Sequence, residues 1–296
     1  MKSLTAAAAA IVLAATMNTQ GQELIRPLTN PVWHGPAGVE TSVHPIFMHQ
    51  ALPGTLNTEL GNVPVDGDFQ VYALQFEIAL SDTLSIVAVK DGFVDFNPDE
   101  TLAEADGIAD IAAGLKKVFK QDDNTVVSAR AVYEIPLGDD DVWQGNGDGI
   151  LAPAVTAATR SDKWQLGGTV GLQVALSDEE SSLLYDAWHV SYAATDAIFP
   201  LVELNHFYTF DAGDGGARFD KHVEGGVPSV ARFEGGDLVN LGASNSDDDH
   251  QLTLGLGCRY KVNEDIAIGA AYEFPLTDDE EGLIDYRVTA DVHIKL

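Results

Sequence analysis

The chain has 296 residues, of which 16 are basic and 46 acidic, giving a formal net charge of −30. That charge repels nucleic-acid phosphates and anionic lipid surfaces, so general nucleic-acid binding is excluded. The single cysteine, Cys258, excludes an intrachain disulfide and any metal site built from several cysteines. With 28 glycines, 12 prolines and 45% apolar residues, the composition fits neither a disordered acidic tail nor a helical membrane protein. A large β-structure is the remaining class.

Residues 1–21 have the pattern of a secretory signal peptide. Lys2 precedes an alanine-rich apolar stretch at 6–15, which is too short to span a bilayer, and a polar run follows. A buried N-terminal helix is the alternative interpretation. No later window approaches the roughly 18 uncharged apolar residues of a transmembrane helix. We therefore expect an exported protein whose residues 22–296 form one β-domain, of which residues 22–40 are an N-terminal periplasmic segment.

Apolar and polar residues alternate with period two along several long segments. In residues 68–80, Tyr72 and Leu74 fall on one face and Gln75 and Glu77 on the other. The segments have about 9–13 residues, which suits a tilted membrane-crossing strand better than the strands of about 5–6 residues in soluble sheets. Twelve such segments can be counted: residues 41–49, 68–80, 84–94, 107–119, 125–136, 150–159, 164–176, 184–194, 198–210, 251–262, 266–275 and 284–296.

The connections between these segments alternate between short and long. Bacterial outer-membrane barrels have this pattern, with short periplasmic turns, longer external loops and an even number of strands. The alternation holds throughout only if the apolar piece 238–241 belongs to the long connection 211–250. The sequence therefore predicts an all-β fold, an antiparallel transmembrane β-barrel of about 12 strands with short periplasmic turns and long external loops.

Several short motifs resemble one known family. They are the Tyr-Glu-apolar-Pro-Leu runs at 133–137 and 272–276, the Gln-Gly-Asn-Gly-Asp loop at 144–148 leading to Leu-Ala-Pro at 151–153, the Asp-Leu-Val-Asn-Leu-Gly piece at 237–242 and the Tyr-Arg-Val-Thr-Ala-Asp run at 286–291. Together they look like the outer-membrane β-barrel family "putative meta-pathway of phenol degradation" over roughly residues 65–296. The resemblance implies a porin-like or transporter-like barrel that admits hydrophobic or aromatic molecules, and it implies no catalytic residue. The sequence departs from the usual pattern of outer-membrane barrels at Leu296, since their last strand commonly ends in an aromatic residue.

Charged side chains on the other face of the predicted strands would face the barrel lumen. The candidates for lining a pore are Glu77, Lys116, Arg130, Glu134, Glu203, Arg259, Glu273, Arg287 and Asp291. Two interpretations have equal weight. The opposite charges could pair across the lumen and plug it, or they could form charged rings that filter solutes along a narrow pore.

The connection 211–250 is glycine-rich and contains the densest cationic cluster of the chain. A loop of this length in a compact domain is usually functional or disordered. If it folds inward to constrict the pore, the constriction candidates are Arg218, Lys221, His222 and Arg232. A mobile surface loop is the alternative.

Acidic clusters at 139–141, 178–180, 247–249 and 278–281 lie in predicted connections. The nearest approach to a calcium loop, Asn-Gly-Asp-Gly at 146–149, lacks the full ligand pattern. We therefore expect solvated loops, no metal site and no cofactor, with divalent-cation binding by these loops left open. An acidic mouth of this kind would favour cations over anions.

The motifs of the common hydrolases, zinc proteases and phosphate-binding enzymes are missing, so we expect no enzyme. His206, on the apolar face of 198–210, is the best-placed histidine for an outer-membrane lipid hydrolase, but no serine alternates with it. An interfacial histidine is the simpler interpretation.

The sequence thus predicts an outer-membrane channel or uptake protein that passes small, hydrophobic or aromatic molecules by passive diffusion. Its expected partners are outer-membrane lipid and a small-molecule solute, with no nucleic acid, and the choice between monomer and trimer is open. The first alternative is a structural or surface-interaction barrel with a closed lumen. The second is a soluble secreted β-sandwich or barrel, which would bury the aromatic face inside.

Overall fold

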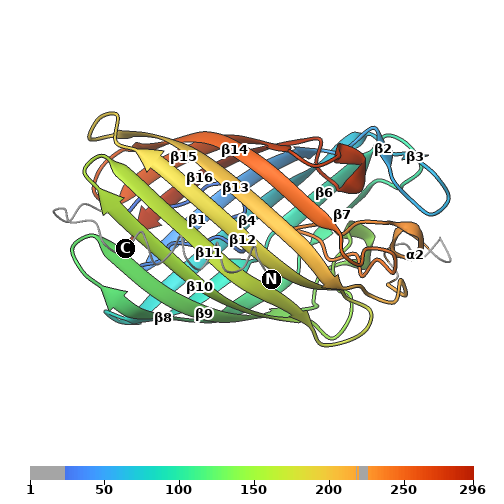
Figure 1. Ribbon diagram of the computed structural model, residues 1–296, viewed down its shortest axis with the longest axis horizontal. Coiled ribbons are helices and arrows are strands. Elements are labelled where there is room, and N and C mark those ends of the chain that lie inside the picture. Colours follow the sequence, from blue (N-terminus) through green and yellow to red (C-terminus); the bar gives the residue numbers. More distant parts are fainter. Residues whose placement is uncertain (1–23, 218, 220–225) are drawn as a thin grey trace.

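The computed structural model describes residues 24–217, 219 and 226–296. The predicted signal peptide at 1–21 lies outside these residues. The described chain forms a closed antiparallel barrel in which β1 pairs with both β4 and β16, so that no strand edge is left along the wall (Figure 1). The wall strands are β1 (Ser42–Ala51), β4 (Gly67–Ser81), β5 (Leu84–Lys90), β8 (Ile111–Gln121), β9 (Thr125–Ile135), β10 (Ile150–Ser161), β11 (Trp164–Ala175), β12 (Ser182–Tyr192), β13 (Ile198–Asp211), β14 (His250–Lys261), β15 (Ile266–Pro275) and β16 (Tyr286–Lys295).

The predicted fold class is confirmed, and each predicted strand overlaps one strand of the wall. Two of the predicted strands are interrupted. The predicted strand 84–94 is divided between β5 and β6 (Phe93–Pro98), and the predicted strand 107–119 is divided between β7 (Ala105–Ile108) and β8. Gly92 lies at the first break with φ of +144°, and a Cβ there would lie 2.7 Å from the carbonyl oxygen of Tyr72. The close approach of β4 therefore requires glycine at this position.

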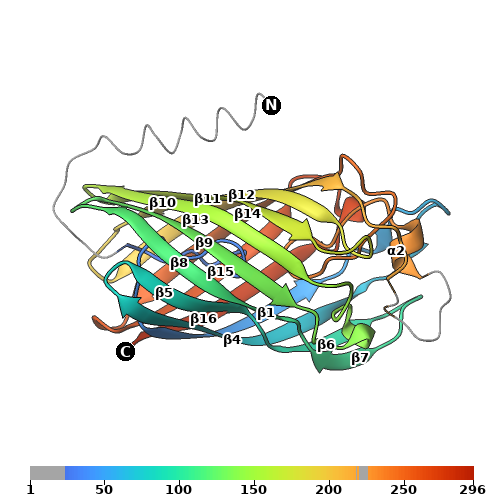
Figure 2. The same cartoon turned by 90° about the horizontal axis from the view of Figure 1, so that it is seen from below.

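The two ends of the barrel differ in the length of their connections. The short turns and the C-terminus lie at one end, and the long loops lie at the other (Figure 2). The loop end carries the remaining short elements, which are β2 (Thr55–Leu56), β3 (Val63–Pro64), η1 (Asp140–Val142), α2 (Val227–Val230) and η2 (Asp279–Glu281). The apolar piece 238–241 lies in the 211–250 loop, as the alternation of connection lengths requires. No helix among the described residues is long and apolar enough to cross a membrane.

The outer surface of the wall is apolar, and the inner surface is polar. Outward side chains such as Phe76, Ile78, Leu115, Val202, Leu256 and Tyr272 are 39–52% exposed. A belt of this kind is typical of strands that face lipid. A soluble β-sandwich or soluble barrel would bury these side chains inside, so the structure differs from that alternative.

Candidate functional site: a lumen closed by two segments

The lumen is occupied by the segment that precedes β1. The sequence predicts a periplasmic segment at 22–40, but residues 24–40 lie inside the barrel: they enter from the short-turn end, turn back near residues 30–34 and return to β1. We call residues 24–40 the lumenal segment. Asn30, with φ of 51°, shapes the turn by accepting a hydrogen bond from Trp33 N through its side chain and from His34 N through its carbonyl oxygen. Leu28, Thr29 and Trp33 are each 0–1% exposed.

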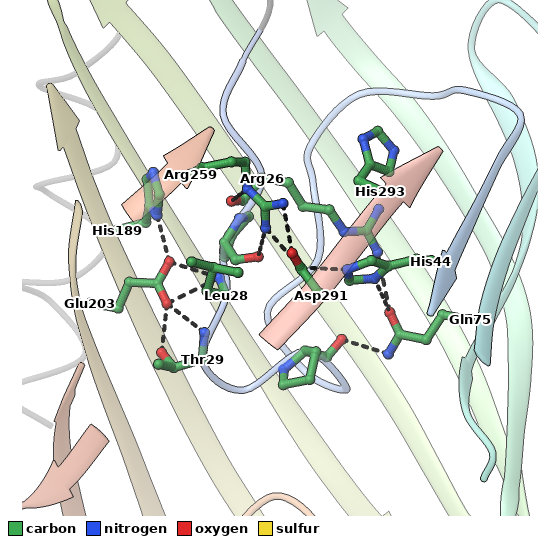
Figure 3. Close-up of polar contacts among 12 residues, drawn as sticks. Arg26, Leu28, Thr29, His44, Gln75, His189, Glu203, Arg259, Asp291 and His293 are labelled. Carbon is green, nitrogen blue, oxygen red and sulfur yellow. Dashed lines mark hydrogen bonds and ion pairs between the residues drawn. The ribbon is translucent and has the colours of Figure 1, made fainter. Parts of the chain in front are cut away.

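A carboxylate of the wall holds the inward limb of the lumenal segment. Glu203 on β13 accepts hydrogen bonds from Leu28 N at 3.0 Å and from Thr29 N and Thr29 Oγ1, both at 2.6 Å (Figure 3). These two residues lie in irregular backbone, whose N–H groups have no strand to pair with and need other acceptors. One buried carboxylate therefore satisfies three donors of the segment.

Donors of the wall hold the carbonyl groups of the same segment. Arg259 donates to Arg26 O at 3.0 Å and to Pro27 O at 3.2 Å, and Arg130 donates to Val32 O at 2.9 Å and Trp33 O at 2.6 Å. Further contacts to its backbone come from Gln75 to Pro31 O, Lys116 to Pro36 O, and Gln165 to both Ile25 N and Ile25 O. The wall therefore binds the backbone of the segment more than its side chains, from one limb to the other.

Other wall residues orient these contacts. His189 Nδ1 lies 2.7 Å from Glu203 Oε1, and Asp291 accepts two hydrogen bonds from Arg259, at 2.9 and 2.8 Å. His44 Nε2 lies 2.6 Å from the other side of Asp291 (Figure 3). Most of these groups come from strands 100 or more residues away from the segment. The contacts are therefore made by a network of side chains that are held in place by one another.

All nine pore-lining candidates are buried on the inner face of the wall. They are Glu77, Lys116, Arg130, Glu134, Glu203, Arg259, Glu273, Arg287 and Asp291. The pairing of opposite charges is extensive, through Lys116–Glu77 at 2.7 Å, Lys90–Glu134, Arg259–Asp291 and Arg287–Glu273 at 3.5 Å. In this state the charges close the lumen together with the lumenal segment. The other interpretation, that they form charged rings that filter solutes along a narrow pore, stays a prediction.

The 211–250 loop closes the opposite end. Its Asp237 forms a double ion pair with Arg287 of β16, at 2.7 and 2.8 Å, and its carbonyl oxygen accepts a hydrogen bond from Trp33 Nε1 at 2.9 Å. The loop therefore reaches into the lumen and touches the tip of the lumenal segment. Arg232, a predicted constriction residue, instead lies at the surface and pairs with Glu59 at 2.8 Å. The other three constriction candidates, Arg218, Lys221 and His222, lie outside the described residues.

Buried carboxylates shape the loop end. Glu234 accepts hydrogen bonds from Ser181 Oγ, Leu241 N and Ala243 N at 2.6–2.7 Å. Burial nevertheless raises the pKa of Glu234 to about 7. Burial and the nearby carboxylate of Glu134 likewise raise the pKa of Glu180 to about 8. At neutral pH, the loop end of the barrel thus contains two acids, in two different connections, that are partly protonated.

Sequence reasoning missed the residues that complete this site. The period-two pattern places Gln75 on the polar face but does not single it out, and His44 and His189 occupy inward positions that the same pattern could have found. Asp237 lies in an irregular loop, and no pattern links it to Arg287. The lumenal segment itself shows no periodicity that distinguishes a lumen filler from a periplasmic linker.

Two cavities lie at opposite ends of the closed lumen. One of about 420 Å³ opens at the short-turn end among polar and ionisable side chains that include Arg26, Glu40 and His293. The other, of about 260 Å³, lies among the loops and is lined mostly by apolar side chains. Two small voids, of about 20 and 40 Å³, lie beside the lumenal segment, each with room for about one to three waters.

Nowhere among the described residues do three or more histidine, cysteine or acidic side chains gather as metal ligands.

Known structures share this fold. The outer membrane channel of the COG4313 group from Pseudomonas putida F1 superposes with a TM-score of 0.61 and 10% identity, over 92% of this chain and 100% of that one. The NanC porin gives a TM-score of 0.51 at 8% identity, over 86% and 100% of the two chains. The β-domain of the Bordetella autotransporter BrkA gives 0.50 at 9% identity, over 87% and 100%. No curated protein sequence matches the chain. A family model does match residues 54–284, which is more than half of the chain, and the protein therefore belongs to the family described as "Putative MetA-pathway of phenol degradation".

Proposed function

We propose that this protein is an outer-membrane channel that takes up small apolar molecules by passive diffusion. The observation that carries the proposal is the apolar cavity of about 260 Å³ at the loop end of a barrel whose outer wall faces lipid. The names of the similar structures, an outer membrane channel and a porin, support the location and the channel activity as an analogy of fold. The proposal includes no enzymatic activity.

The walls of this cavity favour an apolar solute. Leu56, Val65, Trp143, Phe219 and Phe233 line it, and most of these side chains are almost fully buried. For comparison, an apolar protein cavity of about 150 Å³ binds benzene and stays free of water. A cavity of 260 Å³ therefore has room for an aromatic molecule of one or two rings.

Transport from this cavity requires the lumenal segment to move. The contacts that hold it are made by wall side chains such as Glu203 and Arg130, not by the hydrogen bonds that join wall strands. The segment can therefore leave without unpairing the barrel, which stays closed through β1 and its two neighbours. In this proposal, the structure is the closed state of the channel.

A structural barrel with a permanently closed lumen is the second candidate, and the filled lumen favours it. The two candidates differ in the effect of removing the lumenal segment. A chain with the segment deleted gains conductance in either case, but only a channel whose segment moves also shows openings with the segment present. Planar-bilayer recordings of the intact protein without such openings would favour the structural barrel.

The apolar solute is tested by uptake into proteoliposomes. We expect the protein to raise naphthalene uptake above that of protein-free vesicles, which measure permeation through the lipid itself, and we expect Val230→Arg, which places a charge in the wall of the cavity, to abolish this increase. Asn245→Arg is the matched control, since Asn245 is exposed on the same loop and does not line the cavity. Equal naphthalene uptake by the intact protein and V230R would contradict the cavity as the point of admission.

A further inference from the structure

The outward face of β12, β13 and the start of β14 carries a polar cluster in an otherwise apolar wall. Asp186, Trp188, His206 and His250 belong to it, at the loop end of the barrel. They point away from the lumen, since their strand neighbours Ala187 and Phe207 are buried on the inner face. Polar groups in such a position are expensive unless they are satisfied or functional.

The cluster is an ordered chain of contacts. Trp188 Nε1 donates to Asp186 Oδ1 at 2.8 Å, and the other carboxylate oxygen of Asp186 lies 2.9 Å from His206 Nδ1. His206 Nε2 then lies 3.0 Å from His250 Nδ1. The rings of the two histidines are 8° from coplanar, and Tyr208 stacks on His250 with a centroid distance of 4.5 Å.

These contacts fix the direction of a nitrogen lone pair. An ionised carboxylate only accepts, so His206 Nδ1 carries the proton that it donates to Asp186. In the neutral ring, His206 Nε2 is then unprotonated and its lone pair points at His250. A histidine whose second nitrogen donates to a carboxylate is the usual arrangement of a metal-binding histidine and its orienting partner.

We infer that His206 and His250 bind a divalent transition-metal cation of the zinc or copper class, with Asp186 as the residue that positions His206. Imidazole nitrogens suit these metals. Two nitrogens at about 2.05 Å from a tetrahedral zinc ion are about 3.3 Å apart, so the pair must separate by only about 0.3 Å. His250, which is exposed, tilts and shifts its proton from Nδ1 to Nε2 to do so. Water completes the coordination, because only two protein ligands converge.

The site joins the two strands on either side of the long loop. His206 lies near the end of β13, after which the 211–250 loop begins, and His250 is the first residue of β14, where that loop ends. A cation bound by both would fasten the base of the loop that places Asp237 against Arg287 in the lumen. Metal binding at the outer surface therefore stabilises the closure at this end.

The test is equilibrium Zn²⁺ binding to the folded, detergent-solubilised protein by calorimetry. We expect one saturable equivalent in the wild-type protein, its loss in His206→Gln and in His250→Gln, and about tenfold weaker binding in Asp186→Asn. His49→Gln is the matched control, because His49 also lies on the outer wall, 3.8 Å from Asp68, but its ring meets Tyr286 and not a second histidine. We expect that variant to bind like the wild type.

Copper gives a second measurement, which would not differ between the wild type and the variants if the two histidines had only a structural role. Electron paramagnetic resonance of the Cu²⁺ complex should show coupling to two imidazole nitrogens in the wild-type protein and to one in H250Q. Zinc should also slow proteolysis within the 211–250 loop of the wild type but not of H250Q. Each variant is checked for folding by heat-modifiable gel migration. Equal Zn²⁺ binding in the wild type, H206Q and H250Q would overturn the inference, as would a Cu²⁺ spectrum of the wild type without paired imidazole nitrogens.

Discussion

The hydrogen bonds of Glu203 make the strongest prediction about the closed lumen. The substitution Glu203→Gln keeps the size of the side chain but replaces one carboxylate oxygen by an amide N–H₂. That group would face Leu28 N, Thr29 N and Thr29 Oγ1, which are themselves donors and now give their hydrogen bonds to the carboxylate. The lumenal segment should therefore bind less tightly in its place.

The magnitude follows from the number of bonds. Hydrogen bonds to a charged group contribute about 1.5–3 kcal/mol and neutral ones about 0.5–1.5 kcal/mol, so weakening three bonds costs about 3 kcal/mol. That cost shifts the ratio of closed to open segment by about 150-fold. In single-channel recordings, we expect Glu203→Gln to raise the open probability by up to this factor, towards that of a chain lacking residues 24–40.

The control is Glu134→Gln, which also neutralises a buried lumenal carboxylate. Glu134 pairs with Lys90, and its bonds are not to the lumenal segment, so we expect the recordings to stay close to wild type. The reasoning would be refuted if Glu203→Gln conducted like the wild type while deletion of residues 24–40 opened the pore. That result would mean that the segment closes the lumen but Glu203 does not hold it.

Three further predictions concern the two closing segments. Trp33→Ala removes a fully buried side chain and its hydrogen bond to Asp237 O, so we expect a loss of about 3–5 kcal/mol in the seating of the segment and a higher basal conductance. Arg287→Met leaves the carboxylates of Asp237 and Glu273 without their partner, and we expect a lower unfolding temperature, with a cost of about 3–5 kcal/mol. The pKa values of Glu180 and Glu234, raised to about 8 and about 7, mean that the loop end of the folded barrel binds more protons than the same residues do in the unfolded chain. The loop end should therefore be most stable below the ordinary carboxyl pKa, and its stability should fall as pH rises through these two values. Amide hydrogen exchange at the loop end, corrected for intrinsic rates, should be slower near pH 5 than near pH 8.5. Gln at both positions should remove that dependence.

The wall of this barrel could be predicted from the sequence because the alternation of apolar and polar residues within each strand shows which side chains face outward and which face the lumen. Lipid-facing Phe76 and lumen-facing Glu77 are neighbours in the chain, and the pleat sends them to opposite faces whatever the rest of the molecule does. The same local rule located all nine charged candidates on the inner face.

The closing segments could not be predicted, because their position depends on partners that are distant in the chain. Thr29 is 174 residues from Glu203, and Trp33 is 204 residues from Asp237. Irregular backbone has no periodicity, so nothing local distinguishes a segment bound in a lumen from a linker in solvent. The break at Gly92 could not be predicted for a related reason, since the positive φ and the contact with Tyr72 on the neighbouring strand, which together require glycine there, exist only in the assembled sheet.

The position of the lumenal segment also has a consequence for the order of assembly. This segment precedes every wall strand, whereas Glu203 and Arg259, which hold it, come from β13 and β14, and Asp291, which positions Arg259, comes from β16. Their contacts join residues 174 to 233 positions apart and require β16 to reach β1. The first part of the described chain to be synthesised is therefore among the last to find its place, and a barrel interrupted before its final strand would present an unfilled lumen and a free N-terminal segment.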